Sequence, residues 1–209
     1  MVTPYVLVVP VKPPAHGKSR MRGLDDQQRR ALARAFALDT VHACLDAERV
    51  GAVLVATDDA SFSREFEALG CVTIPDGDTN DLNAALRQAV AEARRRFPDL
   101  TPAALCADLP ALRPDELGRA LAAVVPGGPS FVPDAEGVGT TLYTAPYDAF
   151  DPQFGLDSRR AHQASGGVEV GRDLPSVRRD VDDLEDLRDA RELGLGRHTA
   201  ALVAELDLT

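Results

Sequence analysis

The chain is poor in cysteine, in long apolar runs and in positive charge. Only three of its 209 residues are cysteines, Cys44, Cys71 and Cys106, and no two of them form a C-x-x-C pair. An odd, scattered count argues against a disulfide framework. Each cysteine stands in an apolar context, so we expect small buried residues rather than nucleophiles.

Long hydrophobic stretches are also missing. No run reaches the roughly 18 apolar residues that a membrane-spanning helix needs, so we expect no such span. The apolar run at residues 5–11 is too short for a signal peptide and begins like a strand. Together with the cysteine usage, these absences lead us to expect a soluble, cytoplasmic protein with no membrane partner.

Positive charge is scarce, because 23 Lys and Arg face 33 Asp and Glu, for a net charge of -10. Binding to nucleic acid depends on neutralising phosphates, so this balance disfavours a nucleic-acid surface. A small anionic substrate remains compatible with the composition, since a few local cations suffice to bind it.

Apolar runs alternate with helical patterns along most of the chain. Runs typical of buried strands begin near residues 5, 52, 71, 103, 130 and 140, and residues 176–182 ("SVRRDVD") predict a late strand. The runs near residues 130 and 140 have no helix between them, so they predict an antiparallel part. The pattern predicts an α/β fold with a mixed, mainly parallel sheet flanked by helices. No repeat or linker is visible, and we expect a single domain over residues 1–209.

Acidic and hydroxyl residues mark several helix starts. Asp25 or Asp26, Asp81 and Asp183 precede helical patterns and suit the N-cap position. Asp157 or Ser158 is expected to cap a shorter helix.

The triplet Gly17-Lys18-Ser19 resembles the end of a phosphate-binding P-loop. The required glycine five residues before Gly17 is replaced by Lys12, and the following helix starts too late to face a phosphate. We therefore reject a P-loop.

A different phosphate site remains open in the same segment. Lys12, Lys18, Arg20 and Arg22 follow the first predicted strand, and ligands in α/β sheets bind beyond the carboxyl ends of strands. These side chains can neutralise a triphosphate and the charge on a departing pyrophosphate. A solvated basic loop explains them equally well.

Three aspartates in distant segments are candidate metal ligands. Asp108 follows a predicted strand directly, and Asp180 and Asp182 alternate on the predicted late strand, which would point them to the same side. Clustered carboxylates repel each other unless a cation intervenes, and Mg²⁺ prefers oxygen ligands. Alternatively, Asp108 caps the turn at Leu109-Pro110 and the other two only mark a strand end.

Two glycine-containing segments add further polar groups. Residues 137–141 ("GVGTT") and 154–158 ("FGLDS") combine close backbone approach with hydroxyl donors. Ordinary turn chemistry accounts for each segment taken alone. His162 lies four residues after Ser158 on one helix face, so we expect it at the border of a site.

In order along the chain, the motifs resemble those of the CofC/FbiD guanylyltransferases of coenzyme F-420 biosynthesis. They are "VPVKPPAHGKSRM", "TNDLNAAL", "ADLPAL", "PDAEGVGTTL", "FGLDSRRAH" and "RDVDDLEDL", and they span residues 6 to about 195. Val138 stands where that family often has a threonine or a smaller residue, a departure at the expected acid pocket.

This resemblance implies a Rossmann-like nucleotidyltransferase fold, the fold of nucleotide-diphospho-sugar transferases. It also implies an enzyme that transfers GMP from GTP to phosphoenolpyruvate, with Mg²⁺ as cofactor and a downstream transferase as a partner for the product. By motif, the phospho acid would contact Thr140, Gly155 and Ser158, Mg²⁺ would contact Asp108, Asp180 and Asp182, the triphosphate would contact Lys12, Lys18 and Arg20, and the nucleoside would contact Asn83. The catalytic set would be Lys12, Lys18, Arg20 and Asp108.

Other functions stay open on the sequence alone. The acid can instead be 2-phospho-L-lactate or 3-phosphoglycerate. The chain can also be another nucleotidyltransferase, such as a molybdopterin or sugar-phosphate enzyme, or a non-catalytic nucleotide-binding regulator. A regulator needs no cluster of carboxylates, so nucleotide binding without pyrophosphate release would favour it.

Overall fold

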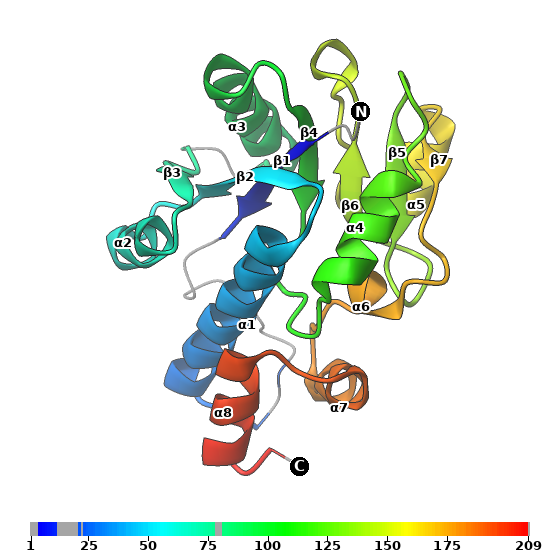
Figure 1. The fold of residues 1–209 in the computed structure, drawn as a ribbon. Helices are drawn as coiled ribbons and strands as arrows, with labels where there is room; N and C mark the ends of the chain where they lie inside the picture. The colour runs from blue at the N-terminus through cyan, green and yellow to red at the C-terminus, as the bar shows by residue number, and fades with distance from the viewer. Residues whose placement is uncertain (1–3, 12–20, 22, 78–80, 209) are drawn as a thin grey trace.

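One mixed sheet organises the chain. The computed structural model describes residues 4–11, 21, 23–77 and 81–208, and within them the sheet has seven strands in the order β3-β2-β1-β4-β6-β5-β7 (Figure 1). The strands are β1 (Tyr5–Pro10), β2 (Val50–Ala56), β3 (Val72–Ile74), β4 (Thr101–Leu105), β5 (Ser130–Pro133), β6 (Thr140–Thr144) and β7 (Val168–Glu169).

The helices are α1 (Asp26–Asp46), α2 (Ala60–Ala68), α3 (Leu82–Arg96), α4 (Pro114–Ala122), α5 (Ser158–Ala164), α6 (Pro175–Arg178), α7 (Leu184–Leu193) and α8 (Arg197–Glu205), with a 3-10 turn, η2, at Tyr147–Ala149. In the described part of the chain, no helix combines the length and the apolar character needed to cross a bilayer.

The sheet is parallel except at β6. Strands β1, β2, β3 and β4 run parallel, β6 pairs antiparallel with both β4 and β5, and β5 pairs parallel with β7. The expected α/β fold with an antiparallel part at residues 130–144 is therefore confirmed. The two-residue strand β7 was not predicted.

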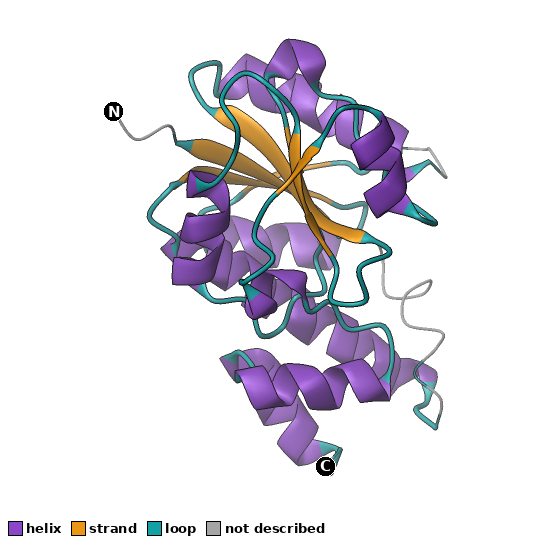
Figure 2. Cartoon of the chain, turned by 90° about the vertical axis from the view of Figure 1, so that its right-hand side faces the viewer, coloured by secondary structure: helices purple, strands orange, loops and turns teal. Residues whose placement is uncertain are grey.

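Helices cover both faces of the sheet (Figure 2). The apolar side chains of β1 alternate between these two faces. Leu7 and Val9 pack in one buried cluster with residues of α1, α2, α4 and α6. Val6 and Val8 pack in a second cluster with α3. Continuous apolar runs are what strands buried on both faces require.

Local capping fixes several helix starts as expected. Asp25 accepts a hydrogen bond from the N–H of Gln28 and forms a capping box at α1. Asp81 caps α3 and Asp183 caps α7 through their side chains. Asp157 occupies the N-cap position of α5, as expected, but its side chain makes no capping hydrogen bond there.

The C-terminal helices form a separate layer beside α1. A third buried cluster joins Met21, Leu32 and Phe36 to Val181 and to Leu187 of α7 and Val203 of α8. Figure 1 shows α7 and α8 below the sheet, with α8 against the lower part of α1. This packing places residues 179–183, which lead into α7, near the segments that follow β1 and β4.

Candidate active site

Asp108 lies beside the segment that carries Asp180 and Asp182. Cys106 and Ala107 separate Asp108 from the end of β4, so the strand ends slightly earlier than expected. The backbone N–H of Val181 donates a hydrogen bond to the carbonyl oxygen of Asp108 over 3.0 Å. The structure thus places Asp108 near the segment that carries Asp180 and Asp182, and a metal held by these three residues stays a prediction.

The expected strand at residues 176–182 is wrong. Pro175–Arg178 forms the short helix α6, and the chain is irregular from there to the cap of α7. Proline at the first position favours a helix start. The N–H of Asp180 bonds to the carbonyl of Arg178 over 3.2 Å, a turn rather than a strand ladder. Contact with Asp108, not strand alternation, therefore places Asp180 and Asp182.

Two further carboxylates lie at the same place. One oxygen each of Asp134, Glu136 and Asp180 lie within 4.8 Å of one another. Asp134 and Glu136 follow β5, in a stretch whose glycines alone drew attention in the sequence. Acidic residues in a turn are usually solvated, so nothing local distinguished them from ordinary surface charge.

Asp180 is the electrostatic centre of this acidic cluster, which we define as Asp108, Asp134, Glu136, Asp180 and Asp182. Burial is the largest cause that raises the pKa of Asp180, and the four other carboxylates raise it further, to about 8. Its buried Oδ1 has no hydrogen-bond partner among the described residues. Such an oxygen costs about 1–3 kcal/mol, which a proton or a cation relieves.

The acidic cluster fits a divalent metal ion. It offers only carboxylate oxygens, the ligands that hard cations such as Mg²⁺ prefer. The unpartnered Oδ1 and the raised pKa of Asp180 both indicate an excess of negative charge at one point. These residues can therefore bind a divalent cation.

Asp134 also shapes the adjacent glycine-containing loop. Its carboxylate accepts hydrogen bonds from the N–H groups of Val138, at 2.9 Å, and Gly139, at 2.6 Å. A Cβ on Gly139 would lie 2.3 Å from Oδ2 of Asp134, so only glycine fits there. The guanidinium of Arg178 donates hydrogen bonds to the carbonyls of Pro133 and Asp134 and thereby stabilises the turn. The loop is thereby joined to the acidic cluster.

Thr140 and Ser158 lie on elements that this loop connects. Thr140 begins β6 directly after Gly139, and Ser158 is the first residue of α5; both are buried. The backbone N–H of Arg159 donates to the carbonyl of Val138 over 3.0 Å. The two predicted acid-binding segments are thus adjacent, next to the acidic cluster.

The backbone before α5 forms a tight turn. Gly155 has a φ of 134° and Asp157 a φ of 57°, and the N–H of Ser158 donates to the carbonyl of Gly155 over 3.2 Å. Positive φ at Gly155 costs little because it has no Cβ. The same turn leaves Leu156 98% exposed.

The side chain of Asn83 forms hydrogen bonds with the backbone just before this turn. Its Nδ2 donates to the carbonyl of Phe154 and its Oδ1 accepts from the N–H of Phe154, each over 2.8 Å. Asn83 therefore holds residues 153–158 from α3. Its contact with a nucleoside stays a prediction.

The predicted triphosphate ligands Lys12, Lys18 and Arg20 lie outside the described residues. The described residues closest to this segment are Val11 and Met21. Val11 follows β1 and its N–H bonds to the carbonyl of Ala56. Met21 is fully buried in the cluster that contains Val181.

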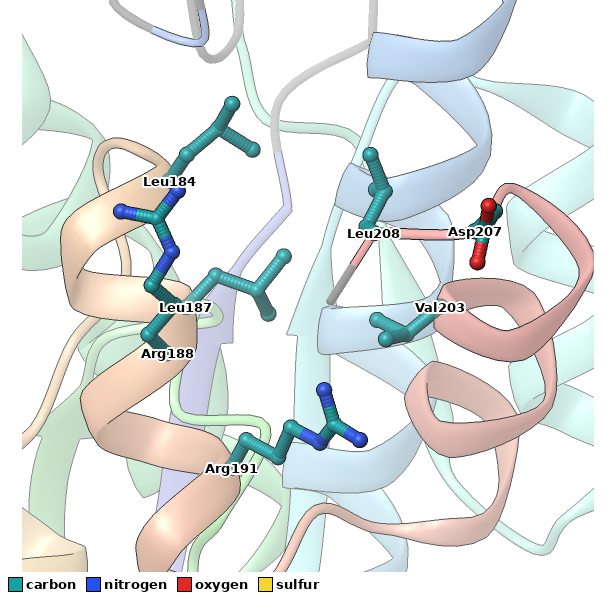
Figure 3. A pocket seen from close by; sticks show the side chains of 7 residues that line it. All are labelled: Leu184, Leu187, Arg188, Arg191, Val203, Asp207 and Leu208. Atoms are coloured by element: carbon teal, nitrogen blue, oxygen red, sulfur yellow. The ribbon is translucent and has the colours of Figure 1, made fainter.

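A separate small groove lies between α7 and α8. Figure 3 shows Leu187 and Arg191 of α7 facing Val203 of α8. The groove has a volume of about 140 Å³. None of its lining residues belongs to the acidic cluster or to the acid-binding segments.

The acidic cluster lies beyond the carboxyl end of β4, which is where α/β sheets bind their ligands. Solved structures agree on the fold. A structure from Desulfovibrio desulfuricans G20, assigned to the nucleotide-diphospho-sugar transferases, matches with a TM-score of 0.72 at 16% identity, covering 98% of this chain and 96% of that one. Rv0371c from Mycobacterium tuberculosis, solved in complex with manganese, matches with a TM-score of 0.60 at 20% identity, covering 92% and 100%.

Curated relatives identify the family. The phosphoenolpyruvate guanylyltransferase of Streptomyces coelicolor is 51% identical over 205 residues, covering 97% of each chain. That of Thermomonospora curvata is 50% identical over 204 residues, covering 97% of this chain and 90% of its own. No family model matches the chain. The chain belongs to the phosphoenolpyruvate guanylyltransferase family, so the resemblance seen in its motifs is confirmed.

Proposed function

We propose that this chain transfers GMP from GTP to phosphoenolpyruvate, forming enolpyruvyl-2-diphospho-5′-guanosine and pyrophosphate. The observation that carries the proposal is near full-length identity of 51% to a relative with that name. The acidic cluster beside two hydroxyl-bearing segments supports it, because the reaction joins two phosphates.

The chemistry needs no side-chain base. The phosphate of the acid is already an anion at neutral pH and can attack the α-phosphorus of GTP directly. The difficulty is repulsion between the two anions, so positioning and electrostatic stabilisation carry such a transfer. A site that holds many polar groups in fixed positions can supply this positioning and stabilisation.

In this proposal Asp108, Asp180 and Asp182 hold Mg²⁺. When bound, the ion supplies positive charge that offsets the repulsion between the phosphates. Asp180 is the strongest candidate, because its Oδ1 has no other partner among the described residues. Asp134 is less available, since both of its carboxylate oxygens accept backbone hydrogen bonds.

The phospho acid is held by Thr140, Gly155 and Ser158. The hydroxyl groups of Thr140 and Ser158 donate hydrogen bonds to its oxygens, and the backbone at Gly155 can approach it closely. The adjacency of the two segments supports this assignment, since Arg159 ties Val138 to α5.

The triphosphate of GTP contacts Lys12, Lys18 and Arg20, which offset charge on the departing pyrophosphate. Met21 supports this placement, because the residue directly after Arg20 is buried together with Val181, between two of the proposed metal ligands. Asn83 contacts the nucleoside in this proposal, on the face of α3 that already holds Phe154.

A pyrophosphate-release assay tests the proposal. GTP and ATP are each crossed with phosphoenolpyruvate, 2-phospho-L-lactate and 3-phosphoglycerate, with and without Mg²⁺. We expect release with GTP, phosphoenolpyruvate and Mg²⁺ together. Preference for another acid would reassign the substrate, and nucleotide binding without release would reject the enzyme.

Variants test the residue roles. Asp108→Ala and Asp180→Ala should each lower turnover at least about a hundredfold while the protein stays folded. Asp99→Ala removes an exposed aspartate elsewhere and is the matched control. Near-normal rates in either cluster variant contradict the metal role. Lys18→Ala should raise KM for GTP, with the exposed Arg30→Ala as control.

The reaction product is a labile mixed anhydride, so we propose direct transfer to the next enzyme of coenzyme F-420 biosynthesis. Product yield should rise when that transferase is present. An unchanged yield contradicts a handover but leaves the guanylyl transfer intact.

A further inference from the structure

His162 joins the two segments that are proposed to bind the phospho acid. Its Nδ1 lies 3.0 Å from the hydroxyl oxygen of Thr140, at the start of β6. Its Nε2 accepts a hydrogen bond from the backbone N–H of Gln153 over 2.9 Å, just before Gly155. One imidazole therefore spans both sides of the proposed acid site.

The ring has little freedom to turn. It stacks with Tyr143, with ring centres 4.6 Å apart, and with Phe131, at 5.4 Å, while Phe154 meets it edge-on at 5.4 Å. The side chain of His162 is fully buried. Turning the ring would lose two hydrogen bonds without solvent to replace them.

The ring is also neutral at physiological pH. Burial lowers the pKa of His162 to about 4, although a hydrogen bond with the backbone of Ser158 and the charge of Asp151 act in the opposite direction. A neutral imidazole carries one N–H, so one nitrogen donates and the other accepts.

The hydrogen bonds decide which nitrogen carries the proton. An amide N–H from Gln153 points at Nε2, so Nε2 must accept and the proton is on Nδ1. Nδ1–H then faces two acceptors, the hydroxyl oxygen of Thr140 at 3.0 Å and the backbone of Ser158. The hydroxyl proton of Thr140 has no acceptor among the described residues, so it is left for a ligand.

We propose that His162 is a positioning residue: its Nδ1–H tautomer makes the Thr140 hydroxyl a hydrogen-bond donor to the phospho acid and ties it to the turn at Gly155. This inference rests on the proposed function, because it assumes that Thr140 contacts the acid. A histidine that merely filled the core would have no effect specific to that substrate.

Two substitutions separate the two nitrogens. His162→Gln places an amide near the Nε2 position and keeps a partner for Gln153, but it loses the donor to Thr140. His162→Asn places an amide nitrogen near the Nδ1 position and keeps that donor. We expect His162→Gln to raise KM for phosphoenolpyruvate about tenfold or more, with KM for GTP within about twofold. His162→Asn should raise it less.

A double-mutant cycle with Thr140→Val tests the route. Thr140→Val removes the hydroxyl with little change in shape and should raise the same KM by a similar factor. If His162 acts through that hydroxyl, the double variant should be little worse than Thr140→Val alone. Multiplying effects, or equal effects on both substrates, would overturn the inference. His42→Gln, at a half-buried histidine between α1 and α8, is the control and should leave both KM values unchanged.

A spectroscopic readout is independent of turnover. Imidazole ¹⁵N chemical shifts of the substrate-free protein at pH 7 should show the Nδ1–H tautomer for His162. An Nε2–H tautomer or a charged ring overturns the inference even in an active enzyme. A wild type that is inactive with every phospho acid overturns both proposals, whereas an active wild type with an additive cycle overturns only this one.

Discussion

Acidification should destabilise the protein through His162. The ring is neutral in the fold, because burial lowers its pKa to about 4, whereas an unfolded histidine titrates near 6.5. Between these values only the unfolded chain binds the proton, so the free energy of unfolding must fall as pH falls. The stability is fully present above about pH 6.5 and its loss is complete near the folded pKa.

The magnitude follows from the two pKa values. A difference of about 2.5 pH units at about 1.4 kcal/mol per unit gives at most about 3.5 kcal/mol. Most of it, about 2 to 3 kcal/mol, should be lost between pH 7.5 and pH 4.5. The imidazole is buried and stacks with the rings of Tyr143 and Phe131, so solvent cannot stabilise its charged form.

The assay compares two proteins, because many carboxylates titrate in the same range. Urea unfolding of the wild type and His162→Gln is measured at pH 7.5 and pH 4.5. The wild type should lose about 2 to 3 kcal/mol more than the variant on acidification. An NMR titration of the His162 ring in the folded protein gives the pKa directly. A gap between the two proteins that does not change with pH, or a ring that titrates near pH 6.5, refutes the reasoning.

Three further predictions follow from single contacts. Asp180→Asn should raise the urea midpoint of the metal-free protein at pH 9, because it removes one of several clustered negative charges; an unchanged or lower midpoint contradicts this. Gly139→Ala should destabilise by about 1–3 kcal/mol through a 2.3 Å clash with a carboxylate, whereas Gly128→Ala, where a Cβ meets nothing within 4 Å, should not. Asn83→Leu should raise KM for the phospho acid about tenfold by releasing the turn before α5. A rise in KM for GTP instead would support the nucleoside contact.

The sequence predicted the elements whose causes are local. Buried strands such as β1 are continuous apolar runs, and Asp81 and Asp183 bond to N–H groups two or three residues further on. Such signals act within a few residues, so they are readable without a fold. The mainly parallel character of the sheet followed from the alternation of strands and helices, whereas the order of the strands was not predicted.

Only Asp108, Asp180 and Asp182 of the acidic cluster were predicted, because Asp134 and Glu136 join it through tertiary contacts. Asp134 and Glu136 approach Asp180 through the position of β5 and through the bonds of Arg178 to nearby carbonyls. The late strand was mispredicted, since Pro175 starts a helix and Asp180 is placed by a single bond from its neighbour to Asp108. None of these contacts leaves a periodic trace in the sequence.

The charge balance of the site argues that its cations come from elsewhere in the chain. Arg178 and Arg179 are the arginines next to Asp180 in sequence, and both are engaged structurally. Arg178 donates to backbone carbonyls, and Arg179 pairs with Glu136, Asp186 and Asp189. If the chain binds the two anions of the proposed reaction, we expect the positive charge to come from a divalent ion and from Lys12, Lys18 and Arg20. That requirement makes Lys12, Lys18 and Arg20, rather than the arginines beside Asp180, the side chains whose removal should weaken GTP binding.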